Sequence, residues 1–342
     1  MLKLSRYDDI APIGLEEAAT LFGPLRPFSK LVLAVSGGSD SLALLALAAK
    51  WRAISPVTTP EISVATVDHV LRAESTDEAA YVQEIANAFG IPHATLTWSG
   101  EKPATHLQER ARAARYDLLI NHARASGAGA IVTAHHVQDQ AETVLMRLCA
   151  GSGISGLAAM TVVALYNGMP LIRPFLSVDK ARLIATLQAD GLRWLEDPSN
   201  RSSRFERVRL RSAFAALSNE GLDTHRLSKL AARAKRADIA LAHAAGAAFA
   251  NYLIPSGLDG LRFTPELFRE PEEIVLRVVS RALALMRPER EVSLEKAETL
   301  VSRIFAAHAE HQSIRLTLSG QIIALRADGT LEIIPEKDRR RK

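Results

Sequence analysis

The residues best suited to chemistry form a short polar turn, SGGSDS, after an apolar run. Its two glycines permit positive φ and close approach of the backbone, and a loop that opens a helix presents N–H groups to an anion. Three serine hydroxyls add donors. A plain strand-to-helix connection capped by Ser39 or Asp40 is the alternative. We favour phosphate binding, because this pattern rarely arises by chance, and assign it to Ser36, Gly37, Gly38, Ser39, Asp40 and Ser41.

Two glycine patterns narrow the kind of nucleotide site. The turn contains no lysine and does not match GxxxxGK[ST], which excludes a Walker-type hydrolase loop. A literal G-x-G-x-x-G match occurs at Gly151–Gly156, but it follows a predicted helix instead of a strand. We therefore exclude a dinucleotide-binding fold there and expect these later glycines to end a helix in a tight loop.

Asp40 and Asp139 could bind Mg²⁺, which in nucleotide sites uses one or two carboxylates together with phosphates. Capping or solvated positions are the alternative, but both aspartates follow predicted strands, where parallel sheets bind their ligands. Glu142 shares a helix face with Asp139, so it could hold a cationic amine or accept its proton. A helix-opening acid favoured by the helix dipole is the competing interpretation.

Basic and histidine side chains accompany these acids. Arg112 and Arg115 share one predicted helix face and could stabilise charge on a phosphate, or could simply reach solvent from an amphipathic helix. Adjacent strand residues point to opposite faces, so we expect one of His135 and His136 to reach the site and place His135 there. A zinc site is disfavoured because no third soft ligand is suitably spaced. Asp68 could support ribose, adenine or a target base.

Alternating strand-like and helix-like segments must position these residues. This order implies a parallel sheet with helices on both faces, and the polar clusters begin where the strands stop. We therefore expect an α/β catalytic domain over residues 1–215. The strand-like segments are Leu31–Val35, Ile62–Val67 and Ala130–Thr133, and the helix-like segments are Ser39–Trp51, Asp77–Phe89, Thr105–Arg124 and Gln138–Ala150.

The second half of the chain has a different composition. After a turn at Asp197–Asn200 it becomes rich in arginine and then in alanine to about Tyr252, which predicts helices. Segments of β type follow at Ile314–Leu318 and Ile322–Ile334. We expect a mainly helical C-terminal domain with a short β ending over residues 216–335, and a charged tail over residues 336–342.

Positive charge is concentrated in this half. The whole chain carries a formal net charge of +4, whereas residues 201–238 contain ten Lys or Arg against four Asp or Glu. Such a block attracts a polyanion through counterion release, although a solvated helix face is the alternative. The charge distribution therefore makes nucleic acid a candidate partner.

The composition limits the class of protein. At 342 residues, 48% hydrophobic and 23% charged, the chain can form two soluble domains with sizeable cores. Without a leader pattern or a membrane-length apolar run, we expect a cytoplasmic location and no membrane partner. The single cysteine, Cys149, excludes an internal disulfide and any Cys-x-x-Cys pair, and we expect it to be buried. The oligomeric state stays open, with a homodimer as one expectation.

The SGGSDS turn resembles the PP-loop of the ATP pyrophosphatases, which have an adenine nucleotide alpha-hydrolase-like fold. Further motifs resemble, in order and spacing, those of the tRNA(Ile)-lysidine synthetase family, and Gly257–Ile334 resembles its first C-terminal domain. The chain resembles the shorter form of that family. The further motifs are Val67–Arg72, Ala111–Tyr116, Thr133–His136 with Asp139–Thr143, Arg173–Pro174, and Trp194 with Glu196–Asn200.

This resemblance implies ligation of L-lysine to C2 of the wobble cytidine in the CAU anticodon of an isoleucine tRNA, with ATP and Mg²⁺. ATP adenylates the C2 oxygen and releases pyrophosphate, and the lysine ε-amine then displaces AMP. The PP-loop would hold the β and γ phosphates. The implied roles are catalysis by Asp40, Arg115, Asp139 and Glu142, nucleotide binding by the turn with Asp68 and His135, metal binding by Asp40 and Asp139, and tRNA binding by Arg207, Arg209, Arg211, Arg233, Lys235 and Arg236.

Two positions depart from the family's pattern. Gln138 stands where an acid often precedes the second aspartate, so we assign it no metal, and Val208 replaces the asparagine of an arginine-asparagine pair. A sulfur-inserting PP-loop enzyme would normally need a cysteine pair or cluster, and a glutamine-dependent synthetase would need a glutaminase segment or partner. A catalytically inactive tRNA-binding protein is the remaining alternative, which the intact acidic residues oppose.

Overall fold

The computed structural model describes residues 10–55, 59–70, 75–100, 107–196, 214, 217–255, 260–290 and 292–336. The chain forms two compact units. The N-terminal unit comprises Met1–Cys149 and Ala159–Ala231, and the C-terminal unit comprises Ala150–Ala158 and Ala232–Lys342. The domain boundary predicted at residues 215 and 216 falls outside the described residues and stays a prediction.

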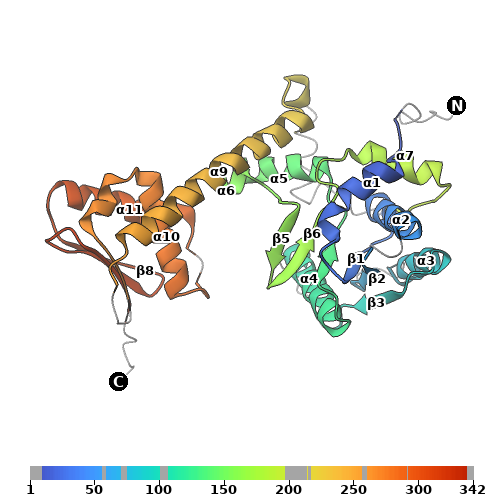
Figure 1. The fold of residues 1–342 in the computed structure, drawn as a ribbon, viewed down its shortest axis with the longest axis horizontal. Coiled ribbons are helices and arrows are strands. Elements are labelled where there is room, and N and C mark those ends of the chain that lie inside the picture. The colour runs from blue at the N-terminus through green and yellow to red at the C-terminus, as the bar shows by residue number, and fades with distance from the viewer. Residues whose placement is uncertain are drawn as a thin grey trace. The chain divides into compact units, whose positions relative to one another are not determined.

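A six-stranded sheet in the order β3-β2-β1-β4-β6-β5 forms the centre of the N-terminal unit (Figure 1). The central strand β1 pairs in parallel with β2 and β4, β3 and β6 continue the parallel arrangement, and the edge strand β5 runs antiparallel to β6. The strands are β1 (Lys30–Ala34), β2 (Glu61–Asp68), β3 (His93–Thr97), β4 (Ala130–Val132), β5 (Val163–Tyr166) and β6 (Met169–Ile172).

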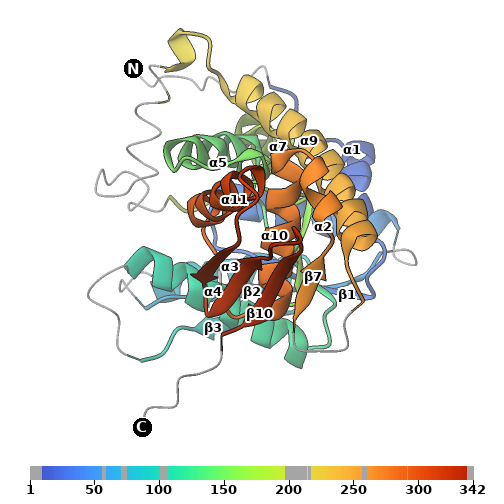
Figure 2. The same ribbon diagram turned by 90° about the vertical axis from the view of Figure 1, so that its left-hand side faces the viewer.

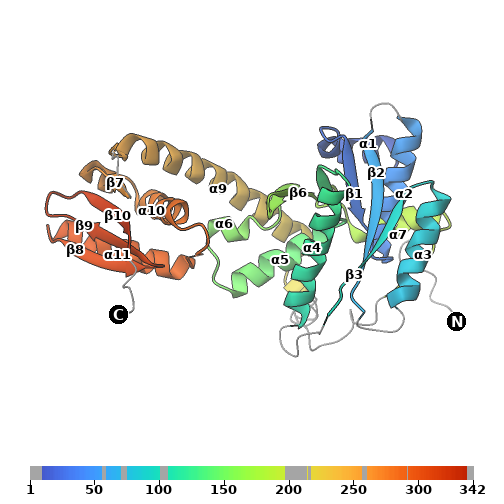
Figure 3. The same cartoon turned by 90° about the horizontal axis from the view of Figure 1, so that it is seen from below.

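Helices cover both faces of this sheet (Figure 3). Helices α1, α2, α3 and α7 pack with Leu31 and Leu33 of β1, whereas α4 packs with Val32 on the opposite face. Successive β1 residues thus enter different cores, which explains the continuous apolar run of this strand. The predicted α/β architecture is confirmed. The helices are α1 (Leu15–Leu21), α2 (Ser39–Ile54), α3 (Ser75–Ala88), α4 (Leu107–Ala125), α5 (Val137–Cys149) and α7 (Lys180–Ala189).

Helix α2 is buried along most of its length, since every residue from Leu42 to Ala49 is buried. The sheet covers one side, and α1 and α7 pack on others. The ring of Phe22 lies 5.2 Å from that of Trp51 and 5.9 Å from that of Phe175. This all-round packing accounts for the leucine and alanine run that follows the SGGSDS turn.

Two features of this unit differ from the predictions. Strands β3, β5 and β6 were not predicted, although Asn167 and Gly168, both at positive φ, form the hairpin turn between β5 and β6. The expectation that Cys149 is buried is wrong, because it lies exposed in the last turn of α5. The last buried residue of α5 is Leu145, one turn earlier.

The C-terminal unit packs helices on an antiparallel sheet in the order β7-β10-β9-β8 (Figure 2). Side chains of α10, α11 and the end of α9 form one core with the inward-facing residues of the sheet. The predicted mainly helical domain with a short β ending is confirmed, and β7 is an additional strand. The elements are α9 (Thr224–Tyr252), β7 (Leu261–Phe263), α10 (Glu272–Met286), α11 (Leu294–Ala309), β8 (Ile314–Leu318), β9 (Gln321–Leu325) and β10 (Leu331–Pro335).

Residues Ala150–Ala158, here called the excursion segment, follow α5 but belong to the C-terminal unit. The segment contains the short helix α6 (Ile154–Leu157). Ser155 donates its hydroxyl to Asp238 of α9 at 2.5 Å, and Arg277 of α10 pairs with the same carboxylate at 2.9 Å. These polar contacts attach the excursion segment to two helices of the C-terminal unit.

The glycines of the excursion segment have structural roles. Gly151 follows the end of α5 with φ of +65°, a conformation that favours glycine. A Cβ at Gly153 would lie 2.9 Å from Cδ2 of Leu294, so the backbone there needs the missing side chain. The expectation that these glycines end a helix and form a tight loop is confirmed. Among the described helices, none is both long and apolar enough to cross a membrane.

Candidate active site

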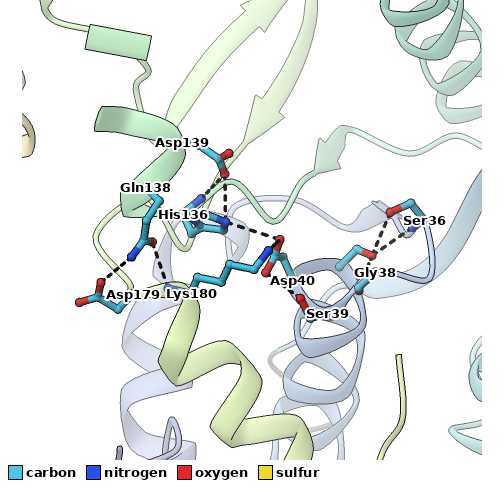
Figure 4. A network of polar contacts seen from close by, with 10 residues as sticks. Ser36, Gly38, Ser39, Asp40, His136, Gln138, Asp139, Asp179 and Lys180 are labelled. Atoms are coloured by element: carbon cyan, nitrogen blue, oxygen red, sulfur yellow. Dashed lines mark hydrogen bonds and ion pairs between the residues drawn. The ribbon is translucent and has the colours of Figure 1, made fainter. Parts of the chain in front are cut away.

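The SGGSDS turn lies between β1 and α2, as predicted. Gly37 has φ of +85°, and a Cβ there would lie 3.0 Å from Cδ1 of Leu195, whose backbone N–H donates to the Gly37 carbonyl at 2.9 Å. The Ser41 hydroxyl accepts from the Ser36 N–H and donates to the Gly38 carbonyl, each at 3.1 Å (Figure 4). The turn is therefore held by its own hydrogen bonds and by the backbone of Leu195, which follows α7.

Helix α2 begins without a side-chain cap. Its N-cap residue is Gly38, and the Ser39 hydroxyl donates to Asp40 at 3.1 Å. Capping by Ser39 or Asp40, the alternative weighed for the turn, is therefore wrong. The N–H groups of the first helical turn have no acceptor within the helix, so they can bind an anion.

Two carboxylates from different elements meet at one imidazole (Figure 4). Nε2 of His136 lies 3.5 Å from Oδ2 of Asp40 and 3.5 Å from Oδ2 of Asp139. The backbone N–H of His136 also donates to Oδ2 of Asp139 at 2.9 Å, and Nζ of Lys180 lies 3.1 Å from Oδ2 of Asp40. The predicted pair of aspartates is thus brought together beside the turn, with two basic groups.

These contacts favour the charged forms. Burial opposes ionisation of Asp40, but the hydrogen bond and charge of His136, together with Lys180, lower its pKa from 3.8 to about 2. Burial also opposes charging of His136, yet Asp40 and Asp139 outweigh it and raise the pKa of this imidazole. Asp40 is therefore an ionised carboxylate at neutral pH, as a cation ligand requires.

The first turns of α5 and α7 are fastened to each other. The side-chain amide of Gln138 donates to Asp179 at 2.7 Å, and its oxygen accepts from the Lys180 N–H at 3.1 Å. The Val137 N–H donates to the Val178 carbonyl at 3.0 Å. These hydrogen bonds hold the start of α5, which carries Asp139, next to the start of α7, which carries Lys180.

A second basic group surrounds Tyr116 on α4. The Cζ atoms of Arg112 and Arg115 lie 5.2 and 5.1 Å from the centre of the Tyr116 ring. Burial would raise the pKa of Tyr116, but the charges of Arg115, Arg112 and Arg173 lower it. Arg173 follows β6 and is itself buried. The three guanidiniums therefore form a positively charged cluster, here called the arginine cluster.

Both histidines lie in the loop after β4, which ends at Val132, so the rule of alternating strand residues does not apply to them. Nδ1 of His135 is hydrogen-bonded to the Thr133 hydroxyl at 2.8 Å. Burial and the positive charges of the arginine cluster lower the pKa of His135 to about 3, although the negative charge of Asp139 opposes this shift. The structure thus places His136 at the carboxylates and a neutral His135 beside the arginine cluster.

Asp68 and Glu142 are two further buried acids. Asp68 ends β2 and accepts from the Val70 N–H at 2.8 Å and from the Thr76 hydroxyl at 3.4 Å. Glu142 lies in α5, one turn after Asp139. Their positions are compatible with the expected contacts to nucleotide and lysine, which stay predictions.

The residues predicted to bind tRNA are only partly described. Arg233 and Arg236 lie exposed on α9, whereas Lys235 pairs with Asp238 at 3.9 Å. At 3.6 residues per turn, Lys235 points to a different side of the helix from these arginines. Three further predicted residues, Arg207, Arg209 and Arg211, lie outside the described residues.

Sequence reasoning missed Lys180 and Asp179, and of the two candidate histidines it assigned His135 instead of His136 to the site. Lys180 follows the Arg173–Pro174 motif by only a few residues, but no local pattern links it to a turn 140 residues earlier. Only the packing of α7 beside α2 brings the two together. A search for basic residues that open a helix after a strand-end motif could have included it.

Residues 14–217 match the PP-loop domain family. The chain is 48% identical to the tRNA(Ile)-lysidine synthase of Methylobacterium sp. (strain 4-46), over 98% of this chain and 98% of that protein. The chain belongs to the tRNA(Ile)-lysidine synthase family. It is also 44% identical to the tRNA(Ile)-lysidine synthase of Bradyrhizobium sp. (strain BTAi1 / ATCC BAA-1182), over 100% of this chain and 99% of that one.

Membership of the tRNA(Ile)-lysidine synthase family confirms the resemblance expected from the motifs and makes the chain an ATP-binding enzyme of tRNA processing. A solved structure, the U34-tRNA thiolase NcsA from Methanococcus maripaludis with its [4Fe-4S] cluster, has a TM-score of 0.54 to this chain at 15% identity. The alignment covers 64% of this chain and 77% of the thiolase. At that identity, the likeness supports the PP-loop fold alone.

Proposed function

We propose that this enzyme uses ATP to attach L-lysine to C2 of the wobble cytidine in the CAU anticodon of an isoleucine tRNA. The observation that carries the proposal is the meeting of Asp40 and Asp139 beside the anion-binding turn, in a chain of this family. The C2 oxygen would attack the α phosphate and release pyrophosphate. The lysine ε-amine would then attack C2, lose a proton and displace AMP.

The turn and the first N–H groups of α2 would bind the phosphates that leave as pyrophosphate. Among the described residues, no group of three or more His, Cys, Asp or Glu side chains could hold a metal unaided. Two converging carboxylates fit Mg²⁺, which completes its shell with substrate phosphates and water, so Asp40 and Asp139 would hold it. When bound, Mg²⁺ would neutralise phosphate charge.

The arginine cluster would stabilise charge on the α phosphate during transfer, with Arg115 in the catalytic role and His135 as a neutral contact. Arg173 is buried and Arg115 is half-buried, so these guanidiniums are positioned before the charge develops, whereas Arg112 reaches the cluster from an exposed position. Glu142 would hold the lysine amine or accept its proton. For Asp68, ribose, adenine and the target cytidine remain alternatives.

Recognition of tRNA would rest on the positively charged block of residues 201–238 and on the C-terminal unit. Arg233 and Arg236 are exposed and suited to phosphate contacts, which provide affinity and salt dependence. Lys235 was expected to share this role, but its contact with Asp238 suggests a smaller contribution. A cytoplasmic location and a homodimer stay predictions.

Incubation of the protein with ATP, L-lysine and an unmodified tRNA transcript bearing CAU tests the function. Mass analysis of the cytidine and release of pyrophosphate are the readouts, and a transcript with UAU is the control. Pyrophosphate release and lysine incorporation with the CAU transcript alone support the proposal. Binding of tRNA without either product would instead indicate an inactive binding protein.

A further inference from the structure

The phosphate-binding turn of this protein contains no lysine, yet a lysine from a distant helix lies beside it. Nζ of Lys180, the first residue of α7, is 3.1 Å from Oδ2 of Asp40, 140 residues away in sequence (Figure 4). Asp40 directly follows Ser39 at the start of α2. The packing of α7 against α2 therefore supplies the turn with an ammonium group that its own sequence lacks.

Several contacts fix the backbone from which Lys180 extends. Its N–H donates to Gln138 at 3.1 Å, and the preceding residue, Asp179, accepts from the same Gln138 at 2.7 Å. Leu183 and Leu187 of α7 are fully buried in the core that also contains α2. The stem of Lys180 thus starts from a rigid position, while its side chain remains 44% exposed and can reach a ligand.

A purely structural role, an ion pair that ties α7 to α2, must be weighed against this. A second pair, Lys50 with Asp190, already joins the opposite ends of these two helices. Partly exposed ion pairs contribute little to stability, typically about 0 to 1 kcal/mol. Both pairs join a lysine to an aspartate, and their side chains are similarly exposed. Only the Lys180 pair lies at the SGGSDS turn.

We propose that Lys180 binds the phosphates held by the turn and so contributes to recognition of the pyrophosphate moiety of ATP. An ammonium group has three donor hydrogens, and the contact with Asp40 uses one of them. The others can bond phosphate oxygens. When Asp40 coordinates a cation, the ammonium turns from the carboxylate to phosphate.

The position of Lys180 distinguishes its target from that of the arginine cluster. Lys180 contacts the first turn of α2, whereas Arg112 and Arg115 extend from α4 on the other face of the sheet. The two sets of basic groups therefore serve different parts of the nucleotide. Lys180 acts on the leaving pyrophosphate, and the arginines act on the α phosphate that stays with AMP.

The inference rests on nucleotide binding at the proposed active site, but its test does not require lysidine formation. Calorimetry on the full chain with Mg²⁺ would measure the affinity for inorganic pyrophosphate and, separately, for AMP. The variants are Lys180→Met, Lys180→Arg and the matched control Lys50→Met. Unfolding monitored by tryptophan fluorescence would establish that each variant is folded.

We expect Lys180→Met to weaken pyrophosphate binding about 10- to 100-fold, the effect typical of a lost charge-assisted hydrogen bond, and to leave AMP binding unchanged. Lys180→Arg should retain most of the affinity, and Lys50→Met should bind both ligands like the unmodified protein. If Lys180→Met does not fold, Lys180→Gln, which also removes the charge, is measured in its place with the same expected loss.

Three results would overturn the inference. One is pyrophosphate affinity in Lys180→Met within about twofold of the unmodified protein. Another is an equal loss of pyrophosphate and AMP affinity in that variant, which would indicate a general disturbance of the site. The third is the absence of pyrophosphate binding by the unmodified protein. Failure of the unmodified protein to form lysidine, with these affinities as expected, would refute the proposed function and leave the role of Lys180 intact.

Discussion

Replacement of Asp40 by asparagine removes one negative charge and almost no volume. Since 1 pKa unit corresponds to about 1.4 kcal/mol, the fall in the pKa of Asp40 from 3.8 to about 2 represents roughly 2 kcal/mol of folding stability. The Asp40 side chain is only 27% exposed, so solvent screens this interaction incompletely. A folded-state pKa below the unfolded value stabilises the protein above about pH 4, and this contribution is lost as the pH falls toward 2.

The assay exploits the distribution of tryptophan. All three tryptophans of the chain, Trp51, Trp98 and Trp194, lie in the N-terminal unit. Urea unfolding followed by their fluorescence therefore reports on the unit that contains Asp40. We expect Asp40→Asn to unfold at lower urea concentration than the unmodified protein at pH 7, by about 2 kcal/mol, with the difference shrinking below pH 4.

The same variant should be catalytically inactive although folded. Loss of a metal ligand should reduce AMP formation by more than about 100-fold, since residues that merely support metal ligands already give 10- to 100-fold effects. Asp190→Asn is the matched control, because Asp190 pairs with a lysine at the other end of the same helices. Near-normal AMP formation by Asp40→Asn, or a stability loss that does not change between pH 7 and pH 3, would refute this reasoning.

Three other changes have defined outcomes. Asp139→Ala should abolish AMP formation, whereas Gln138→Ala should be active and lose about 1 to 3 kcal/mol of stability with its two hydrogen bonds; activity assays and urea unfolding check both. Replacing Arg233 and Arg236 by Gln should lower the slope of tRNA affinity against salt by roughly 1 to 2, measured by filter binding, without altering ATP affinity. Glu332→Gln should destabilise the C-terminal unit above pH 4.5, because paired arginines lower the pKa of Glu332 against the effect of burial, and hydrogen exchange should show this difference vanish at lower pH.

The parts of the site that adjoin one another in sequence were predictable. The turn from Ser36 to Ser41 carries its own glycines and hydroxyls, and strand-helix alternation indicates where it lies. Asp139 could be paired with Asp40 because parallel strands end at one edge of a sheet. Local pattern and general topology are sufficient for these residues.

Other parts depend on packing that no local pattern records. Lys180 reaches Asp40 because α7 packs on α2 through buried leucines, a contact between segments far apart in the chain. The two histidines were placed by strand alternation, which failed because β4 ends before them. Strands β5 and β6 are four residues each, too short for an alternating pattern to distinguish them from loop.

The excursion segment affects how the chain can be synthesised and divided. Ser155 leaves the ribosome 122 residues before Arg277, its hydrogen-bond partner. At about 5 to 20 residues per second, the segment waits roughly 6 to 24 s for that partner, while its flanking residues can already fold into the catalytic unit. No single cut separates the two units completely, since the chain passes between them at residues 149, 158 and 231. A fragment ending at residue 231 would therefore retain the excursion segment but lack the helices that it contacts. Truncation at that point would leave the excursion segment without its partners, as it is during synthesis, and chaperones could bind it.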